Sequence, residues 1–456
     1  MNALYIICGL GMISLLAEIF NFKKALFPIV MVGLLAAIAV AVLDGGDANQ
    51  VFSNMINFDR VAIAFTILIS ITAFSWFWMA KDYFSNDSHL TDRFAIVLFS
   101  LVGAIILTSI NNMVMLFLGI EILSISMYVL AGSNKKNLFS TEAAFKYFLM
   151  GSFATGFLLM GIALIYGATG TFELSKISAF ISAHPSDLPS FFYTGVIMVL
   201  IGMSFKVSAV PFHFWAPDVY DGSPTPVTAF MSTIVKTAAF AALVRLFNGC
   251  FAEISSTWLI IFSVIAAITL VLANITAVYQ TNVKRMLAYS SVGHAGYLLI
   301  AVVSSGNIQG VILYYLFGYS FASLLAFAVI TRLEEKNESL TIENFNGLFS
   351  RSPFLTFSMT VALLSLAGIP PLAGFFGKYL LLSLAVGSGH IWLVMIAIAT
   401  STIGVYYYFK IILAMYFKKS ALGQIDLSQF LKILLVLLLL IVLVAGIFPD
   451  LFLGLL

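Results

Sequence analysis

Long apolar runs separated by short polar joints make up most of the chain. About fourteen of these runs approach the length of about 20 residues that a helix needs to cross a hydrocarbon layer. They lack the period-two alternation of barrel strands, and the run at 430–448 is far longer than such a strand, so the pattern favours helices. The predicted spans are 3–20, 27–43, 61–79, 94–110, 113–131, 147–167, 191–209, 226–247, 257–277, 286–304, 308–331, 353–383, 390–416 and 431–448.

The overall composition indicates the same class of protein. Hydrophobic residues make up 61% and charged residues 9% of the 456 positions, which is far more apolar than a soluble domain can be. The first run has neither a basic leading segment nor a small-residue cleavage site, so we expect a retained span rather than a signal peptide. The sequence therefore predicts an all-α polytopic membrane protein in contact with the lipid bilayer.

Residue types that hold common metals and cofactors are sparse. Cys8 and Cys250 are the two cysteines, and they form neither a CxxC pair nor a cluster with histidines. Iron–sulfur, haem c and zinc ligation are therefore unsupported, and we expect no cofactor in this chain. The segment "FFGKY" does not complete a phosphate loop, which excludes nucleotide binding on that basis. The net charge of +2 gives no indication of nucleic-acid binding.

The basic residues favour one set of connections between spans. If successive connections alternate sides, most lysines and arginines fall in the odd-numbered ones, whereas the even-numbered ones hold Arg60, Lys176 and Arg245. Cytoplasmic loops carry the excess of lysine and arginine in membrane proteins. We therefore expect the odd connections in the cytoplasm and both termini on the opposite side.

A small set of ionisable side chains lies inside the predicted spans: Glu121, Lys206, Lys236 and Lys378. Each costs roughly 2.5–3.5 kcal/mol even on lenient insertion scales. Structural explanations exist, because a lysine near a helix break can snorkel to the interface and a glutamate can serve only a buried ion pair. The functional alternative is a line of titratable groups at the membrane midplane, since a desolvated lysine releases its proton readily and a nearby carboxylate restores it.

His294 lies about halfway into the predicted span 286–304. A lone membrane histidine often only hydrogen-bonds to a neighbouring helix, so a structural role and a proton-relay role are equally open. Lys284 and Arg285, at the start of the same span, are interpreted as a cytoplasmic anchor.

Prolines interrupt two of the predicted spans. The segment 204–230 contains Pro211, and the stretch "GIPPLAGFFGK" contains Pro370 and Pro371. Broken helices at membrane depth are tolerated where they are buried in protein or line a wet cavity, so these breaks predict hydrated half-channels. The broken spans are the seventh and the twelfth, five apart, and an odd repeat of five helices inverts its second copy.

This spacing predicts an inverted repeat of spans 4–8 and 9–13. It divides the single membrane domain into four segments. They are a three-helix segment at 1–90, a first repeat at 91–250, a second repeat at 251–418 and a C-terminal helix at 419–456.

Three stretches of this sequence resemble a known family: "LAGIPPLAGFFGKYLLL", "FKVSAVPFHFWAPDVYDGSPTPVTAFMSTIVKTAAF" and "VKRMLAYSSVGHAGYLL". They are similar to the antiporter-like membrane subunits of respiratory complex I and its relatives, over most of residues 90–385. The resemblance implies that Glu121 pairs with Lys206. It also implies that Lys236 is the central lysine of the proton path, that Lys378 lies toward its exit, and that His294 holds a polar relay position.

The same resemblance implies the setting in which the chain works. Flavin, iron–sulfur clusters and quinone would belong to partner subunits, and quinone reduction there would drive proton movement here. The expected partners are the other membrane-arm subunits and the peripheral redox subunits of complex I in a bacterial inner membrane, with the termini on the periplasmic side.

Three other functions stay open at this point. A cation/proton antiporter subunit of the Mrp type and a membrane subunit of an energy-converting hydrogenase share this helix plan by resemblance. A scaffold subunit, whose charges only fix helix packing, belongs to a different class and predicts that mutation harms assembly without changing coupling.

Overall fold

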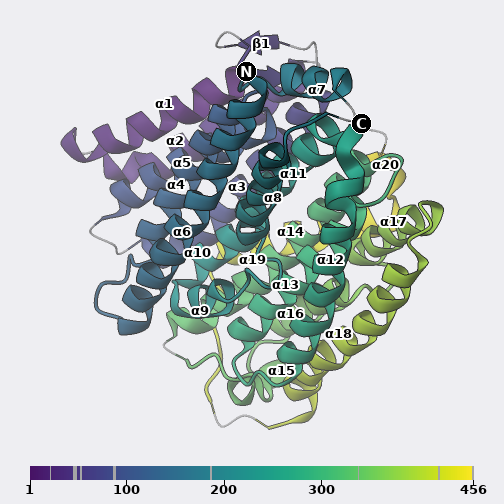
Figure 1. Ribbon diagram of the computed structural model, residues 1–456. Coiled ribbons are helices and arrows are strands. Elements are labelled where there is room, and N and C mark those ends of the chain that lie inside the picture. The colour runs from purple at the N-terminus through teal and green to yellow at the C-terminus, as the bar shows by residue number, and fades with distance from the viewer. Residues whose placement is uncertain are drawn as a thin grey trace.

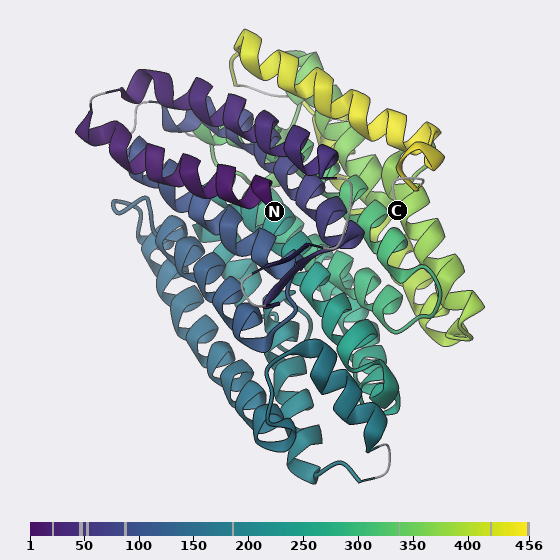
Figure 2. The ribbon, with the colours of Figure 1, turned by 90° about the horizontal axis from the view of Figure 1, so that it is seen from above.

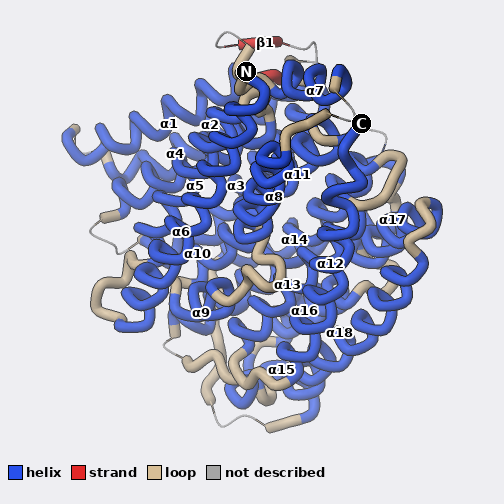
Figure 3. The backbone as a smooth tube through the Cα atoms, viewed as in Figure 1, coloured by secondary structure: helices blue, strands red, loops and turns tan. Residues whose placement is uncertain are grey.

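The computed structural model describes residues 1–20, 22–44, 49–51, 54–85, 89–184, 187–336, 338–419 and 422–453. Within these ranges the chain is a bundle of helices that carries a small hairpin at one end (Figures 1 and 3). In the hairpin, β1 (Asn49–Val51) pairs antiparallel with β2 (Ile56–Phe58).

The helices follow the apolar runs of the sequence. In the first half of the chain they are α1 (Asn2–Ile19), α2 (Lys23–Leu43), α3 (Arg60–Phe84), α4 (Leu90–Thr108), α5 (Met113–Ala131), α6 (Leu138–Thr169), α7 (Leu174–Ala183), α8 (Ser190–Lys206), α9 (Trp215–Gly222), α10 (Thr225–Phe230), η1 (Met231–Val235), α11 (Lys236–Val244) and η2 (Arg245–Cys250). In the second half they are η3 (Ala252–Ile254), α12 (Ser255–Val278), α13 (Val283–Val302), α14 (Ile308–Glu335), η4 (Ile342–Phe345), α15 (Leu348–Arg351), α16 (Pro353–Ala367), α17 (Ala373–Gly387), α18 (Ile391–Phe417), α19 (Gln429–Ile447) and α20 (Asp450–Leu453).

Among the described residues, 11 helices are long and apolar enough to cross a membrane. Three of the predicted spans are not among these helices, and the structure shows why. α8 has 17 residues, and α16 and α17 have 15 each, because they are parts of interrupted spans. α13 has 20 residues but is buried along nearly its whole length, and a helix that meets protein on all sides tolerates polar residues.

The two predicted helix breaks are confirmed, and they have the same backbone geometry. After α8 the chain adopts a positive φ of 58° at Ser208, and after α16 it adopts 84° at Gly368. The next residue closes the turn in each case: the amide of Ala209 donates to a carbonyl five residues back at 2.9 Å, and that of Ile369 does so at 3.0 Å. Such a left-handed residue with a bond across the end is a common way to finish a helix.

A second pair of features relates the two halves. The side chain of Asn112 caps α5 by accepting a bond from the amide of Val114 at 2.8 Å, and Asn282 caps α13 through Lys284 at 2.8 Å. Each asparagine also forms an antiparallel bridge to a residue that follows the next helix. These bridges are Asn112 with Glu173 and Asn282 with Thr341.

The two bridges lie at opposite ends of the bundle. Glu173 precedes α7, at the end that carries the hairpin, whereas Thr341 lies in the connection that leads to α15 at the other end (Figure 1). The matched breaks and the matched bridges therefore support an inverted relation between the two halves. The segment boundaries given above stay predictions.

The structure also contains elements that the sequence pattern did not predict. Strands of three residues are too short to show an alternating pattern, and α7 has only 10 residues, which is too few to span a membrane. These elements lie together at the end of the bundle that holds the even-numbered connections (Figure 1).

Buried helices from both halves form the centre of the molecule. The most apolar window of Thr225–Cys250 is 100% buried and that of α14 is 89% buried. α13 contacts α9, α14 and α17, so it joins the two broken spans. α1 and α2 contact α4 and α3, and Figure 2 shows them on the same flank as α19. This arrangement places the interrupted spans on either side of one polar helix.

Candidate functional site

Lys236 lies at the centre of the bundle and is 2% exposed. It begins α11 directly after η1, a segment of π-helix, which is a helix form that often occurs at functional sites. Its ammonium donates to the backbone carbonyl and to the hydroxyl of Ser291 on α13. The Tyr319 hydroxyl donates to the same Ser291 oxygen at 2.9 Å. Neutral oxygens, rather than a carboxylate, hold this lysine.

Lys206 ends α8 and is 6% exposed. Its ammonium donates to the Ser124 hydroxyl on α5 at 2.8 Å. Glu121, one helical turn before Ser124, accepts a bond from the Thr155 hydroxyl of α6 at 2.8 Å. Glu121 and Lys206 lie within electrostatic range of each other. The structure therefore places the two residues near each other without a direct ion pair, and each is bonded to a different hydroxyl group.

A small cavity of about 10 Å³ lies next to this group. Ser124, Tyr128, Thr155 and Lys206 are among its lining residues. This volume is close to the space that one water molecule requires, and the lining supplies polar partners. A water molecule there would lie between Lys206 and Thr155, whose hydroxyl binds Glu121.

His294 lies on α13 and is 6% exposed. Its Nδ1 lies 2.7 Å from the Tyr315 hydroxyl, and its Nε2 lies 3.5 Å from the Tyr408 hydroxyl. Lys236 and Lys378 both lie within electrostatic range of the imidazole. Another cavity of about 10 Å³ borders the ring. The histidine is thus the group that connects the surroundings of the two lysines.

Lys378 lies on α17, after the second break. Its ammonium donates to the Ala367 carbonyl at 2.8 Å and to the Ser401 hydroxyl at 3.2 Å. Ala367 is the last residue of α16, and the free carbonyls at a helix C-terminus attract cations. The residue also borders a groove of about 670 Å³ between α17 and α18. The broken helix thus supplies Lys378 with a hydrogen-bond acceptor, the Ala367 carbonyl, and places it beside the groove.

The three lysines share one further feature. Each ammonium lies within 6 Å of a tyrosine ring centre, a range in which the face of the ring attracts a cation. The distances are 5.9 Å for Lys206 and Tyr147, 5.6 Å for Lys236 and Tyr319, and 5.0 Å for Lys378 and Tyr297.

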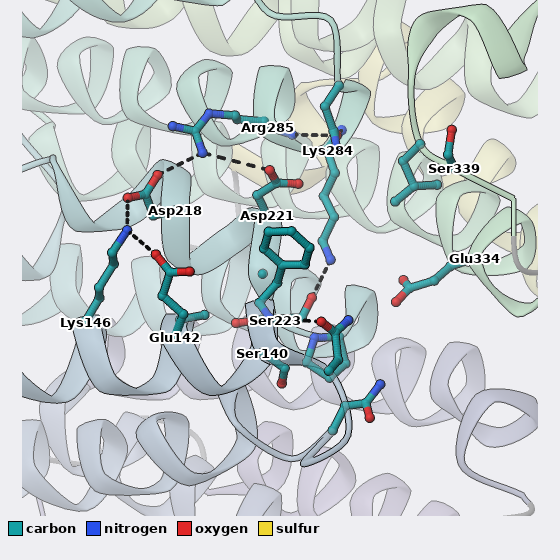
Figure 4. A pocket seen from close by; sticks show the side chains of 18 of the residues that line it. Ser140, Glu142, Lys146, Asp218, Asp221, Ser223, Lys284, Arg285, Glu334 and Ser339 are labelled. Carbon is teal, nitrogen blue, oxygen red and sulfur yellow. Dashed lines mark hydrogen bonds and ion pairs between the residues drawn. The ribbon is translucent and has the colours of Figure 1, made fainter.

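A polar cavity of about 510 Å³, which we call the vestibule, lies at the end of the bundle that holds the odd-numbered connections (Figure 4). Lys146 contacts Glu142 and Asp218, each at 2.7 Å, and Arg285 contacts Asp218 at 2.8 Å and Asp221 at 3.8 Å. The remaining lining residues include Asn134, Asn137, Ser140, Ser223, Asn282, Lys284, Glu334, Glu338 and Ser339. The vestibule brings together residues from both halves of the chain.

The structure differs from the sequence-based interpretation at the start of α13. Lys284 and Arg285 were expected as an interfacial anchor, but Lys284 is 2% exposed and Arg285 takes part in the ion pairs of the vestibule. The asparagine cap turns this helix start inward, because the loop before it pairs with Thr341.

Sequence reasoning also missed the hydroxyl partners of the site: Ser124, Thr155, Ser291, Tyr315, Tyr319 and Tyr408. A signal existed on α13, where Ser291 precedes His294 by three residues and follows Lys284 by seven, a spacing that places them near one helix face. The partners on other helices depend on tertiary packing.

The fold and this arrangement define a class of membrane proteins with interrupted helices that carry a chain of buried titratable groups. A model of the family described as NADH:quinone oxidoreductase/Mrp antiporter, TM, matches residues 110–404, and the chain belongs to this family.

Curated relatives match the chain along its whole length. A NADH-quinone oxidoreductase subunit N from Cytophaga hutchinsonii is 42% identical over 456 residues and covers 99% of both chains. One from Flavobacterium psychrophilum is 43% identical over 457 residues and covers 100% of both.

Solved structures show the same fold. A chain of respiratory complex I from Thermus thermophilus has a TM-score of 0.84 at 31% identity and covers 99% of this chain and 98% of its own. A chain of the archaeal membrane-bound sulfane sulfur reductase has a TM-score of 0.89 at 25% identity, with coverages of 100% and 96%. A chain of the Mrp complex from a Dietzia species has a TM-score of 0.88 at 19% identity, with coverages of 99% and 95%, and shows the fold alone.

Proposed function

We propose that this chain is the N-type membrane-arm subunit of a proton-pumping NADH:quinone oxidoreductase and moves protons through its buried charges. The observation that carries the proposal is the identity of 42% and 43% to full-length N subunits, together with the buried titratable residues Lys206, Lys236 and His294. The three structural neighbours come from different complexes with similar TM-scores, so the sequence identity, rather than the fold, favours complex I.

The orientation follows from the basic residues. The odd connections, which hold most of the lysines and arginines, face the cytoplasm of a bacterial inner membrane, and both termini face the periplasm. The vestibule then opens to the cytoplasm. The partners are the other membrane-arm subunits and the peripheral subunits, which supply flavin, iron–sulfur clusters and quinone.

In this proposal the chain performs no redox chemistry of its own. Lys236 takes a proton from the cytoplasmic side, because a neutral amine among hydroxyl groups is a ready acceptor. His294 and its tyrosines carry the proton toward Lys378 through adjacent hydrogen-bonding groups. Lys378 releases it beside the groove between α17 and α18. Glu121 and Lys206 set the charge of the first half, so that a change in one alters the proton affinity of its neighbours.

The alternative is an Mrp-type cation/proton antiporter subunit or the membrane subunit of an energy-converting hydrogenase. A chain of a sulfane sulfur reductase and a chain of an Mrp complex share the fold. Mass spectrometry of the assembly, purified in mild detergent through a tag on this chain, separates these functions. Co-purifying flavin and iron–sulfur subunits that oxidise NADH support complex I. Small membrane partners without redox subunits would contradict it.

The pumping role is tested by Lys236→Ala in the purified complex reconstituted into vesicles. We expect quinone reduction to continue while protons moved per quinone reduced fall, because removal of a positioned proton carrier typically slows transfer about 100-fold or more. The matched control is Lys136→Ala, an exposed lysine in the connection before α6. Unchanged proton movement in Lys236→Ala would refute the role.

A further inference from the structure

Lys284 is a buried lysine that the proposed relay leaves without a task. It lies on the first turn of α13, where its ammonium donates to the backbone carbonyl of Ser223 at the floor of the vestibule (Figure 4). Asp221 and Glu334 are the carboxylates within electrostatic range of it. Neither lies within 4 Å of its ammonium in the part of the chain that the structure describes. A buried lysine without a fixed ion pair is costly unless it is used.

The neighbouring arginine gives an internal contrast. Arg285 is held by Asp218 at 2.8 Å, and Asp218 is held in turn by Lys146. These ion pairs fix the wall of the vestibule. Lys284, by comparison, rests on a neutral carbonyl and faces the cavity, so its proton is not held by a carboxylate.

Glu334 ties the vestibule to the helix that carries Lys236. Its carboxylate accepts a bond from the backbone amide of Thr225, the first residue of α10, at 3.2 Å, and another from the Tyr83 hydroxyl at 3.2 Å. A carboxylate at a helix N-terminus is stabilising, so Glu334 has a structural task that keeps it beside Lys284.

A line of hydroxyl groups leads from this floor to the central lysine. Lys284 and Ser291 are seven residues apart on α13, which places them on one face about 10 Å apart. Tyr220, the residue before Asp221 in the chain, is buried, and its hydroxyl lies near the Ser291 side chain. Ser291 binds Lys236 directly. Tyr220 and Ser291 therefore bridge most of the distance between the vestibule and Lys236.

We propose that Lys284 is the proton-uptake residue of this chain, which receives protons from the vestibule and passes them through Tyr220 and Ser291 to Lys236. The proposal rests on the proposed function. In each transfer an N–H bond of the Lys284 ammonium breaks, and a vestibule water takes the proton toward Tyr220. The hydroxyls of Tyr220 and Ser291 each accept one proton and release their own, and the neutral amine of Lys236 gains the last N–H bond. Lys284, now a neutral amine, takes up a proton that enters the vestibule from the aqueous phase as a hydronium ion and leaves a neutral water molecule behind.

The decisive variant is Lys284→Arg in the whole complex reconstituted into vesicles. Arginine retains the positive charge beside Asp221 and Glu334 but does not release its proton. We expect assembly and quinone reduction to persist while proton movement per quinone falls to the level of Lys236→Ala. Tyr220→Phe, which removes one hydroxyl and keeps the ring, is expected to lower proton movement about tenfold or more.

Two outcomes would overturn the proposal. Full proton movement in Lys284→Arg would show that the residue is only a structural cation, and full movement in Tyr220→Phe would refute the bridge. Lys236→Ala separates a failure of this proposal from a failure of the proposed function. If Lys236→Ala loses pumping while Lys284→Arg keeps it, the chain pumps protons but Lys284 is not the uptake residue. If Lys236→Ala also keeps pumping, the proposed function itself fails. Lys135→Arg, at an exposed position before α6, is the matched control and should leave pumping unchanged. If Lys284→Arg does not assemble, Tyr220→Phe still decides the question.

Discussion

The two helix breaks have similar backbone geometry but are followed by different charges. Asp218 lies ten residues after Ser208 in the first break, and Lys378 lies ten residues after Gly368 in the second. Asp218 is fixed by ion pairs with two cations, whereas Lys378 rests on a carbonyl and a hydroxyl beside an open groove. Two breaks of similar geometry are thus followed by charged side chains in different settings, one fixed by ion pairs and one held by neutral groups.

The capped helices α5 and α13 show a second difference of the same kind. Counting from Asn112 and Asn282, Glu121 and Ser291 both lie nine residues on. Each lies near a buried lysine, since Glu121 is within electrostatic range of Lys206 and Ser291 binds the central lysine. At this position the first half therefore places a carboxylate near Lys206, whereas the second half places a hydroxyl against Lys236. A carboxylate favours the ammonium form, whereas a hydroxyl leaves the lysine free to lose its proton.

The largest effect is expected from Ser291→Glu, which gives the second half the carboxylate of the first. The new carboxylate should hold Lys236 as an ammonium, so proton movement per quinone reduced should fall about 100-fold or more. Ser291→Gln, of similar size without charge, is the control and should lose less in the same vesicle assay. Equal losses in the two variants would indicate that size, and not charge, is responsible.

The converse change, Glu121→Gln, removes the carboxylate of the first half and retains its hydrogen bond with Thr155. We expect proton movement to fall about tenfold, because Lys206 loses the charge that favours its ammonium form. Proton movement and assembly should be measured on the same preparation. Loss of assembly with normal coupling in the remaining complex would favour a scaffold role.

Much of the fold could be predicted from the sequence because apolar run length is a direct consequence of bilayer thickness. The two breaks were predictable for a different reason, since the prolines Pro211 and Pro370 cannot continue a helix. The buried charges were visible because they interrupt apolar runs. Ser291 and Tyr408 were not, since serine and tyrosine occur throughout such helices, and only packing brings Tyr408 within 3.5 Å of His294.

A smaller effect is expected at the second break. Gly368 has a φ of 84°, and a Cβ there would lie 2.8 Å from the Cδ of Lys378. Gly368→Ala should destabilise the subunit by about 1–3 kcal/mol and displace Lys378, which thermal denaturation and the pumping assay would register. Gly387→Ala, at a position with no atom within 4 Å of the added carbon, is the control. Equal stability of the two variants would contradict the strain argument.

The smallest effect concerns the carboxylate of Glu173, the residue whose backbone bridges to Asn112. The hydrogen bond from Lys176, with that from Ser175, lowers the pKa of Glu173 below its ordinary value. Its carboxylate therefore adds stability above the ordinary pKa of glutamate, about 4.3, and that stability is lost as the pH falls through the lowered value. Glu173→Gln should be slightly less stable to heat near pH 7, and this difference should disappear in strong acid. A difference that does not change with pH would contradict the assignment.

We propose that Lys236 gains and loses a proton in each pumping cycle. Lys236→Arg keeps the charge but does not release its proton, so the proton movement per quinone reduced by the complex with this variant is decisive. We expect normal assembly, continued quinone reduction and proton movement as low as in Lys236→Ala. Proton movement equal to that of the unchanged complex would show that Lys236 supplies only a fixed charge.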